Sequence, residues 1–472
     1  MKEWAKWLIV CLILFSAAAG QPLFGESEIF DRLGIVSKHG MHGAVPEENI
    51  DLFTGNMTLK FKDIVLPGPG GFDLIIWRVY NSKVYKDHYP GQGSPMQQEP
   101  YSWVGLGWTM HMGRLHIDDP EEHVIEFPDG RWETAYPDVG EDGHITKDFL
   151  KYDMANQKLY FKDGTVWTFG EQRTIQYDVT YSSVVLQVTE IENPLGHKIQ
   201  VSYHSSFPIM TKITDSMGRE VNFEIDDSVG GRPKLTEIIV RDCDGGMVVY
   251  RYDVERFSPT YYHKLVSYKP PVIPASTYEY YSNGTPGEFA LKKLTTSFGG
   301  SVEYEYDDHD FYFFGICLYT RVLKNKTIKF SSSEPAGTWY YNYPNYMNGD
   351  DTVTVNGPEF DTHATYMGYP ESDTETHENA WKIGLLKKKW FTENNSSEVI
   401  YSEEMTWISQ LLSYNHWNIL QYFYGYIRAP LLEKVVKTTK GDADVTVEYW
   451  YGDEVNGVSR NYHKYGLLTD TV

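Results

Sequence analysis

Cysteine is scarce in this chain of 472 residues, which contains three. Cys11 lies in an apolar N-terminal run, so Cys243 and Cys317 are left for the folded part. Two cysteines exclude the disulfide framework that stabilises many small secreted domains. One of them lies in a turn and the other in an aromatic stretch, and nothing in the sequence brings them together. Free thiols are favoured over a bridge, and their pairing stays open.

Positive charge is also in short supply. The chain has 42 Lys and Arg against 65 Asp and Glu, a formal net charge of −23. An acidic surface repels nucleic-acid backbones and anionic lipid headgroups. We therefore expect no nucleic-acid partner.

Long hydrophobic runs are missing beyond the first residues. Residues 1–19 carry Lys2 and Lys6, then an apolar core, then three alanines, which predicts a signal peptide. The core is too short to span a bilayer comfortably. We expect a secreted or cell-surface protein with no membrane span once the signal is removed.

Amphipathic helices are hard to find, whereas aromatic residues are abundant, with 37 Tyr, 22 Phe and 13 Trp. Residues 149–152 and 407–414 allow short helices, although 407–412 fits a buried strand as well. Large aromatic side chains suit a pleated, half-buried surface. The predicted fold class is all-β.

What the chain does have is a repeated unit, a glycine turn followed by an alternating strand. The turn glycines are Gly196, Gly218, Gly245 and Gly299. Seven residues after each lies the last apolar or aromatic strand position: Tyr203, Ile225, Tyr252 and Tyr306. Glycine supplies the positive φ that a tight turn needs, so we assign these four glycines a structural role. The repeat aromatics of these strands are Tyr203, Tyr250, Tyr252, Tyr304 and Tyr306.

The spacing of these glycines indicates an array of hairpins. The intervals are 22 residues (196 to 218), 27 (218 to 245) and 54 (245 to 299). One hairpin cannot bury its own apolar face, so each unit depends on its neighbours. The pattern predicts an antiparallel hairpin array that forms an open, curved sheet. A second hairpin type, with Asp129-Gly130 and Asp163-Gly164 between alternating runs, precedes the array.

Two of the units end in Tyr-x-Tyr-Asp, at 250–253 and 304–307, and an ordered series of motifs precedes them at 49–56, 66–74, 78–82 and 105–108. These features resemble the YD repeats, and the segment before them, of the rearrangement-hotspot (Rhs) family. That family includes bacterial polymorphic toxins, insecticidal toxin-complex shells and the teneurins. The resemblance covers about residues 45 to 460. It implies repeats that spiral as one sheet into a hollow shell, which encloses a C-terminal toxin or presents a surface for adhesion.

The chain also departs from that family, whose members usually carry more repeats, a self-cleaving aspartyl motif and a variable effector. No catalytic residue is therefore carried over. The expected organisation is a signal peptide (1–19), a loosely ordered leader (20–45), an Rhs-type β region (46–184) and YD repeats (185–310). An irregular repeat-like region (311–472) follows, with a polar insertion at 331–379.

Residues that suggest chemistry lack the required patterns. His39 and His42, or His111 and His116, have no metal-ligand spacing. Acidic pairs such as Asp118-Asp119 and Asp350-Asp351 suit turns and an acidic exterior, although paired carboxylates also suit glycoside hydrolysis. We expect no catalytic site, no cofactor and no metal.

Two functions remain open. The first is a secreted, non-catalytic repeat scaffold, the front part of a toxin-type shell or a cell-surface protein. The alternative is a secreted carbohydrate-binding or glycoside-cleaving β protein. The expected partners are a downstream toxin portion, a second copy paired through the open sheet edge at 445–451, or glycans.

Overall fold

A computed structural model describes residues 33–40, 42–43, 47–85, 96–119, 122–138, 143–177, 182–227, 232–241, 245–258, 260, 262–313, 316–331, 335–345, 349–368, 379–394, 396–417, 424–451 and 468–471. Within these residues the chain is almost entirely β, and its helical turns are three short 3-10 segments: η1 (Ser37–His39), η2 (Pro69–Gly71) and η3 (Ala380–Lys382). The predicted all-β class is confirmed. The predicted signal peptide (1–19) and Cys243 lie outside the described residues.

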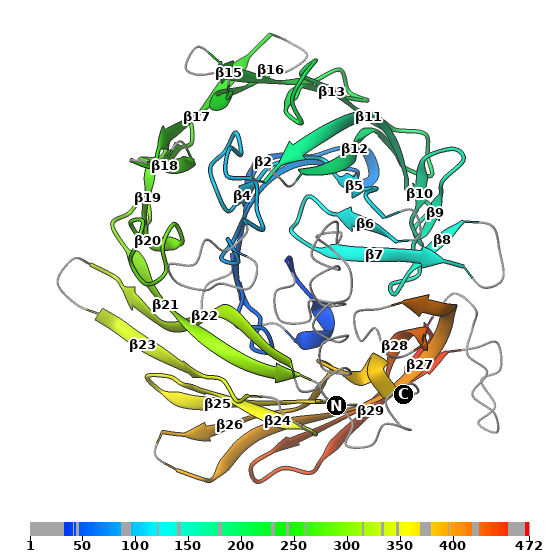
Figure 1. The fold of residues 1–472 in the computed structure, drawn as a ribbon, viewed down its shortest axis with the longest axis vertical. Helices are drawn as coiled ribbons and strands as arrows, with labels where there is room; N and C mark the ends of the chain where they lie inside the picture. The colour runs from blue at the N-terminus through cyan, green and yellow to red at the C-terminus, as the bar shows by residue number, and fades with distance from the viewer. Residues whose placement is uncertain are drawn as a thin grey trace, which may run out of the picture.

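A small inner sheet comes first along the chain. It is antiparallel, in the order β1-β2-β3-β4. Its strands are β1 (Glu48–Ile50), β2 (Met57–Leu66), β3 (Leu74–Asn81) and β4 (Trp108–Thr109). Figure 1 shows this sheet inside the curve of the later strands.

A closed barrel of eight strands, here called the ring, follows. Its strands are β5 (Arg114–His116), β6 (His123–Glu126), β7 (Trp132–Pro137), β8 (His144–Thr146), β9 (Lys151–Asp153), β10 (Lys158–Tyr160), β11 (Val166–Gln176) and β12 (Ser182–Glu192). Neighbours in sequence pair antiparallel, and β12 closes the ring by pairing with β5. The other end of β12, from Glu190 to Glu192, pairs with the next strand and starts the array.

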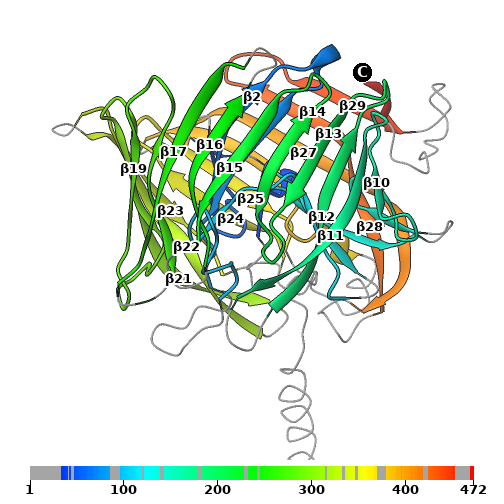
Figure 2. The same cartoon turned by 90° about the horizontal axis from the view of Figure 1, so that it is seen from above.

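The array is a continuous antiparallel sheet, as the hairpin spacing predicted. Over the repeats its strands are β13 (Lys198–Tyr203), β14 (Met210–Asp215), β15 (Glu220–Asp226), β16 (Lys234–Arg241), β17 (Met247–Arg256), β18 (His263–Lys269), β19 (Ser276–Tyr280), β20 (Leu291–Thr295) and β21 (Ser301–Phe313). In β15 the alternation places Val221 and Phe223 in the core and Glu224 outside. Figure 2 shows β13 to β17 side by side as a tilted wall.

The sheet then continues with each strand paired to the next one in sequence. Its last strands are β22 (Ile316–Lys329), β23 (Pro335–Asn342), β24 (Asp351–Asn356), β25 (Phe360–Tyr366), β26 (Leu386–Glu393), β27 (Val399–Trp417), β28 (Tyr424–Thr439), β29 (Val445–Tyr451) and β30 (Leu468–Thr471). The expected polar insertion at 331–379 is therefore corrected, because β23, β24 and β25 belong to the sheet. Both windows that allowed helices contain strand instead, β9 and β27.

The predicted open, curved sheet is wrong in two respects. The sheet begins at the closed ring, and its last strands curve back to that ring (Figure 1). A hydrophobic cluster joins Tyr136, Ile145 and Phe149 of the ring to residues of β27 and β28, including Leu412 and Leu431. Among the described residues no strand pairing crosses this junction, which we call the seam. Residues 445–451 are not the last strand either, because β30 pairs with β29 from Tyr449 to Tyr451.

The main core lies between the inner sheet and the inward face of the array. Part of the expected leader also belongs to the folded body, since Leu33, Ile35 and His39 are buried. Ile35 forms a parallel bridge with Arg131 at the start of the β7 hairpin strand. The expectation of a loosely ordered leader is thus wrong for residues 33–40.

Candidate functional site

A buried ion pair joins two strands of the inner sheet and faces the array. Arg78 on β3 donates through Nε and Nη2 to the two carboxylate oxygens of Asp63 on β2, at 2.7 and 3.0 Å. Both side chains are 1% exposed. Tyr252 donates to Asp63 at 2.9 Å, and Arg78 donates to the hydroxyl of Tyr278 at 2.9 Å. We call these four residues the Arg78 cluster, and it ties the inner sheet to β17 and β19.

A second buried pair ties β1 to β21 and β22. Lys326 donates to Glu48, and both side chains are 0% exposed. Tyr304 donates to the other carboxylate oxygen of Glu48 at 3.0 Å. Burial, and next the charge of Glu48, holds the pKa of Tyr304 well above its ordinary value. The tyrosine therefore stays a hydrogen-bond donor at any physiological pH.

Lys83 forms a third contact between the inner segment and the array. Its ammonium group donates to the carbonyl of Thr54 at 2.9 Å, the hydroxyl of Thr320 at 2.7 Å and the carbonyl of Arg321 at 2.6 Å. These three acceptors use all three donors of the ammonium group. A buried cation is tolerated only with such partners.

Two of the repeat tyrosines and Tyr280 of β19 share a contact that sequence reasoning missed. Each of three tyrosine hydroxyls donates to the backbone carbonyl that lies 15 residues earlier, on the preceding strand: Tyr203 to Val188, Tyr280 to Leu265 and Tyr306 to Leu291. The signal in the sequence was a tyrosine at the same place in successive hairpins, because its carbonyl acceptor then lies a constant 15 residues earlier. Tyr250 is half-buried and packs against the main core.

The four turn glycines lie where the alternation placed them. Their φ angles are +81° at Gly196, +77° at Gly218, +86° at Gly245 and +88° at Gly299. In the turn at Gly218, Asp215 accepts from the backbone N–H groups of Met217 and Arg219. A Cβ at any of the four glycines would meet no atom within 4 Å. The glycine is therefore required by backbone conformation and not by space.

Two histidines that the sequence left without a role meet at one carboxylate. His111 Nε2 lies 2.9 Å from one oxygen of Glu126, and His116 Nε2 lies 3.4 Å from the other. His116 Nδ1 lies 3.0 Å from the hydroxyl of Ser183, which in turn donates to Asp118. The order Ser–His–Glu resembles a nucleophile relay. Ser183 is nevertheless 0% exposed, so no substrate reaches its hydroxyl.

Electrostatics agree with a structural role for this buried group. Burial alone would raise the pKa of Glu126, but His111 and Arg114 hold that pKa well below its usual range. Burial lowers the pKa of His111. Within the part of the chain that the structure describes, no group of three or more His, Cys, Asp or Glu side chains has a metal-binding arrangement.

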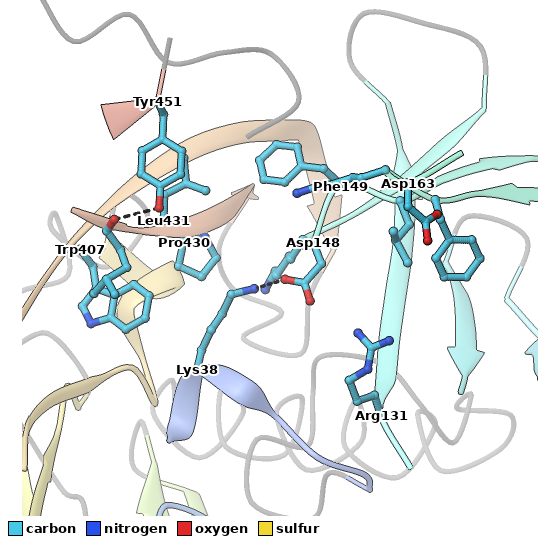
Figure 3. A pocket seen from close by; sticks show the side chains of 14 residues that line it. Lys38, Arg131, Asp148, Phe149, Asp163, Trp407, Pro430, Leu431 and Tyr451 are labelled. Atoms are coloured by element: carbon cyan, nitrogen blue, oxygen red, sulfur yellow. Dashed lines mark hydrogen bonds and ion pairs between the residues drawn. The ribbon is translucent and has the colours of Figure 1, made fainter. Parts of the chain in front are cut away.

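An open pocket of about 600 Å³ lies at the seam, a volume typical of ligand sites. The ring lines one side through Arg131, Phe149 and Asp163, and the last strands line the other through Trp407 and Tyr451 (Figure 3). Lys38 of η1 reaches into it and pairs with Asp148 at 2.6 Å. We call this the seam pocket.

Asp148 lines this pocket, and Glu133 lines a neighbouring pocket that shares Lys38 and Asp148 with it. The pKa values of these two carboxyl groups are shifted in opposite directions. Burial, and next the charge of Asp148, raises the pKa of Glu133 to about 7. Burial opposes ionisation of Asp148 as well, but Lys38 outweighs it and lowers that pKa. Carboxyl pairs whose pKa values are pushed apart are common at functional sites. The volume of the seam pocket and its aromatic and charged lining make it a candidate ligand site on the described surface.

Comparisons with known proteins bear on the inner segment and on the fold. Residues 47–133, which hold the inner sheet and the first ring strands, match a family described as a domain of unknown function (DUF6531). A search of curated proteins gave no match. The match covers too little of the chain to assign the protein to that family, so the resemblance to the Rhs family stays a prediction.

Solved structures similar to this chain include toxin chains. The Tc holotoxin pore of Photorhabdus luminescens is 9% identical with a TM-score of 0.22, over 88% of this chain and 21% of that chain. The TcdB2–TccC3 complex is also 9% identical with a TM-score of 0.23, over 84% of this chain and 26% of that chain. This chain thus spans between a fifth and about a quarter of their length. TM-scores this low carry no argument about function.

No helix among the described residues is long and apolar enough to cross a bilayer.

Proposed function

We propose that this protein is a non-catalytic scaffold, in which a shell of repeat strands holds an inner β segment in a fixed position. The use of buried charge carries this proposal. Arg78, Glu48 and Lys83 on the inner segment each bond to residues of the array. The charged groups of these three side chains are thus bonded within the protein, where they hold the inner segment against the array. The segment of signal-peptide type adds export to the proposal, as part of a toxin-type shell or a cell-surface protein.

Limited proteolysis with hydrogen exchange tests the holding role. The double variant Tyr252→Phe, Tyr278→Phe removes two hydroxyls that contact Asp63 and Arg78. We expect residues 47–85 to become cleavable while the amides of β13 to β16 stay protected. Tyr340→Phe, at a tyrosine that is 54% exposed, is the matched control. If the inner segment of the double variant resists cleavage as well as in the parent protein, the tyrosines do not hold it and the proposal fails.

One observation favours a second function, a carbohydrate-binding or glycoside-cleaving protein. The divergent pKa values of Glu133 and of Asp148, which lines the seam pocket, suit an acid and a carboxylate. A glycan array and a reducing-sugar assay on the mature protein decide between the two functions. Turnover that Glu133→Gln abolishes would establish the second function and reject a non-catalytic scaffold.

A further inference from the structure

The seam pocket is built from motifs that the scaffold function does not use. The two Asp-Gly hairpins of the ring both reach it, since Arg131 follows one turn and Phe161 and Lys162 lie in the other. On the opposite side Trp407 is fixed by a hydrogen bond from its indole N–H to the Leu386 carbonyl, at 2.8 Å. Tyr451 is fixed in the same way by the Leu432 carbonyl, at 2.9 Å. The aromatic walls are therefore oriented before any ligand arrives.

The charge of this pocket has the opposite sign to that of the whole chain. The chain has a formal net charge of −23, yet the pocket is lined by four cationic side chains and two carboxylates. The cations are Lys38, Arg131, Lys147 and Lys162, and the carboxylates are Asp148 and Asp163. Four positive charges against two negative ones leave an excess of two. A positive pocket in an acidic protein favours anions and concentrates them locally.

Lys162 is a cation of this pocket that is free to meet a ligand. Lys38 is paired with Asp148, and Arg131 contacts Asp129 and Glu133. Among the described residues Lys162 forms no ion pair, and its ammonium group lies 5.0 Å from the centre of the Phe149 ring. Partial desolvation lowers the pKa of Lys162. An anion that binds there would replace solvent around an incompletely hydrated charge.

The backbone at this wall is strained, which supports a binding role. Phe149 has a φ of +63°, a conformation that non-glycine residues rarely adopt. The side chain of Thr146 fixes the turn, because its hydroxyl accepts from the N–H groups of Asp148 and Leu150, both at 3.2 Å. Backbone strain of this kind clusters at ligand-binding sites. Here it holds a buried aromatic ring beside Lys162.

We propose that the seam pocket binds a small aromatic anion, whose flat apolar body packs on the aromatic walls and whose carboxylate, sulfonate or phosphate pairs with Lys162. This inference goes beyond the scaffold function and does not depend on it. The contacts that hold the inner sheet in place do not involve the seam pocket, so either proposal can hold without the other.

A matched pair of fluorescent probes tests the proposal on the mature full-length protein. 1-Anilinonaphthalene-8-sulfonate is an aromatic anion, and N-phenyl-1-naphthylamine is the same body without the sulfonate. We expect the anionic probe to saturate at one per chain, and Lys162→Met to weaken it about tenfold, the usual scale of one charge-assisted contact. Lys162→Met leaves the neutral probe within about twofold, because apolar burial is unchanged. Phe161→Leu weakens both probes.

Lys292→Met is the control, because Lys292 also lies over an aromatic ring, that of Tyr281 at 5.6 Å, but does not line the pocket. It leaves both probes unaffected if the proposal holds. The proposal is overturned if the anionic probe does not saturate, if Lys162→Met and Lys292→Met act alike, or if Phe161→Leu changes neither probe. It is also overturned if Lys162→Met weakens the neutral probe as much as the anionic one. Competition between 1-naphthoate and naphthyl phosphate then identifies the preferred anionic group.

Discussion

The inner and outer faces of the array use the same kinds of residue for different purposes. On the inner face Lys326 of β22 is fully buried with Glu48 of the inner sheet, and the inner-sheet pair Arg78 and Asp63 is buried against the same face with several fixed partners. On the outer face basic and acidic side chains form cross-strand pairs such as Arg251–Glu237, whose side chains are 57% and 34% exposed. Water competes for the outer pairs and not for the inner ones. An ion pair therefore contributes to this fold mainly where it joins two layers.

The largest expected effect is at the Arg78 cluster. Arg78→Met leaves the carboxylate of Asp63 buried without its cation, which costs about 3–5 kcal/mol of unfolding free energy. Denaturant unfolding of the parent and the variant measures the difference. Arg251→Met is the outer-face control and should change little. Equal losses in the two variants would remove the distinction between the faces.

Glycine substitutions sharpen the comparison between the faces. Gly107 and Gly218 both have positive φ, but a Cβ at Gly107 would lie 2.5 Å from a ring atom of Tyr80, whereas one at Gly218 meets nothing. We expect Gly218→Ala to cost about 1 kcal/mol from backbone strain alone. Gly107→Ala adds overpacking and should cost about 2 kcal/mol or more. Thermal midpoints of the two variants provide the test, and a larger loss at Gly218 would contradict it.

Glu133 of the ring, which lines the pocket next to the seam pocket, lies between these extremes, and its contribution to stability should depend on pH. The pKa of Glu133 is raised to about 7 in the folded protein, so the folded state holds a proton that the unfolded state releases near its ordinary, lower pKa. Stability from this group is thus present at low pH and is lost as pH rises from about 4.5 to 7.

Glu133→Gln cannot lose that proton. We expect it to be more stable than the parent at pH 8 by about 1 to 3 kcal/mol, with the difference vanishing near pH 5. Thermal unfolding of both proteins across this range measures the difference. Asp148 titrates in the opposite sense, because its pKa is lowered and its contribution is lost in acid. A difference between the parent and Glu133→Gln that does not change with pH would show that Glu133 is ionised throughout.

The smallest effect is expected on the outer face of the repeats. Lys212 and Glu220 form an ion pair across β14 and β15, and their side chains are 40% and 38% exposed. Solvent screening leaves such a pair little net contribution. Lys212→Met should leave the thermal midpoint unchanged within error at moderate salt. A clear loss would mean that the outer ladders stabilise the array more than their exposure suggests.

Period-two alternation and glycine turns were enough to predict the all-β class and the consecutive hairpins over residues 185–310. Both signals are local, because a turn and its strands lie within about a dozen residues. The same local reasoning failed at 331–379, where Thr352 and Thr354 alternate with buried Val353 and Val355 in β24 and the polar composition hid a strand. It also placed residues 33–40 in a loose leader, although Leu33 and Ile35 are buried.

By itself the sequence determined the hairpins, their turns and the inward direction of the repeat aromatics, since each depends on neighbours along the chain. Only the tertiary structure decided that the ring closes, that the array encloses an inner sheet, and that its end returns to make the seam pocket. The partners in those contacts are far apart in sequence, since Tyr252 lies 189 positions after Asp63 and Lys326 lies 278 positions after Glu48. Hydrophobic alternation specifies which face of a strand is buried but not what covers that face. We infer that the buried ion pairs supply this missing specificity, because a charge without its partner is too costly to leave inside.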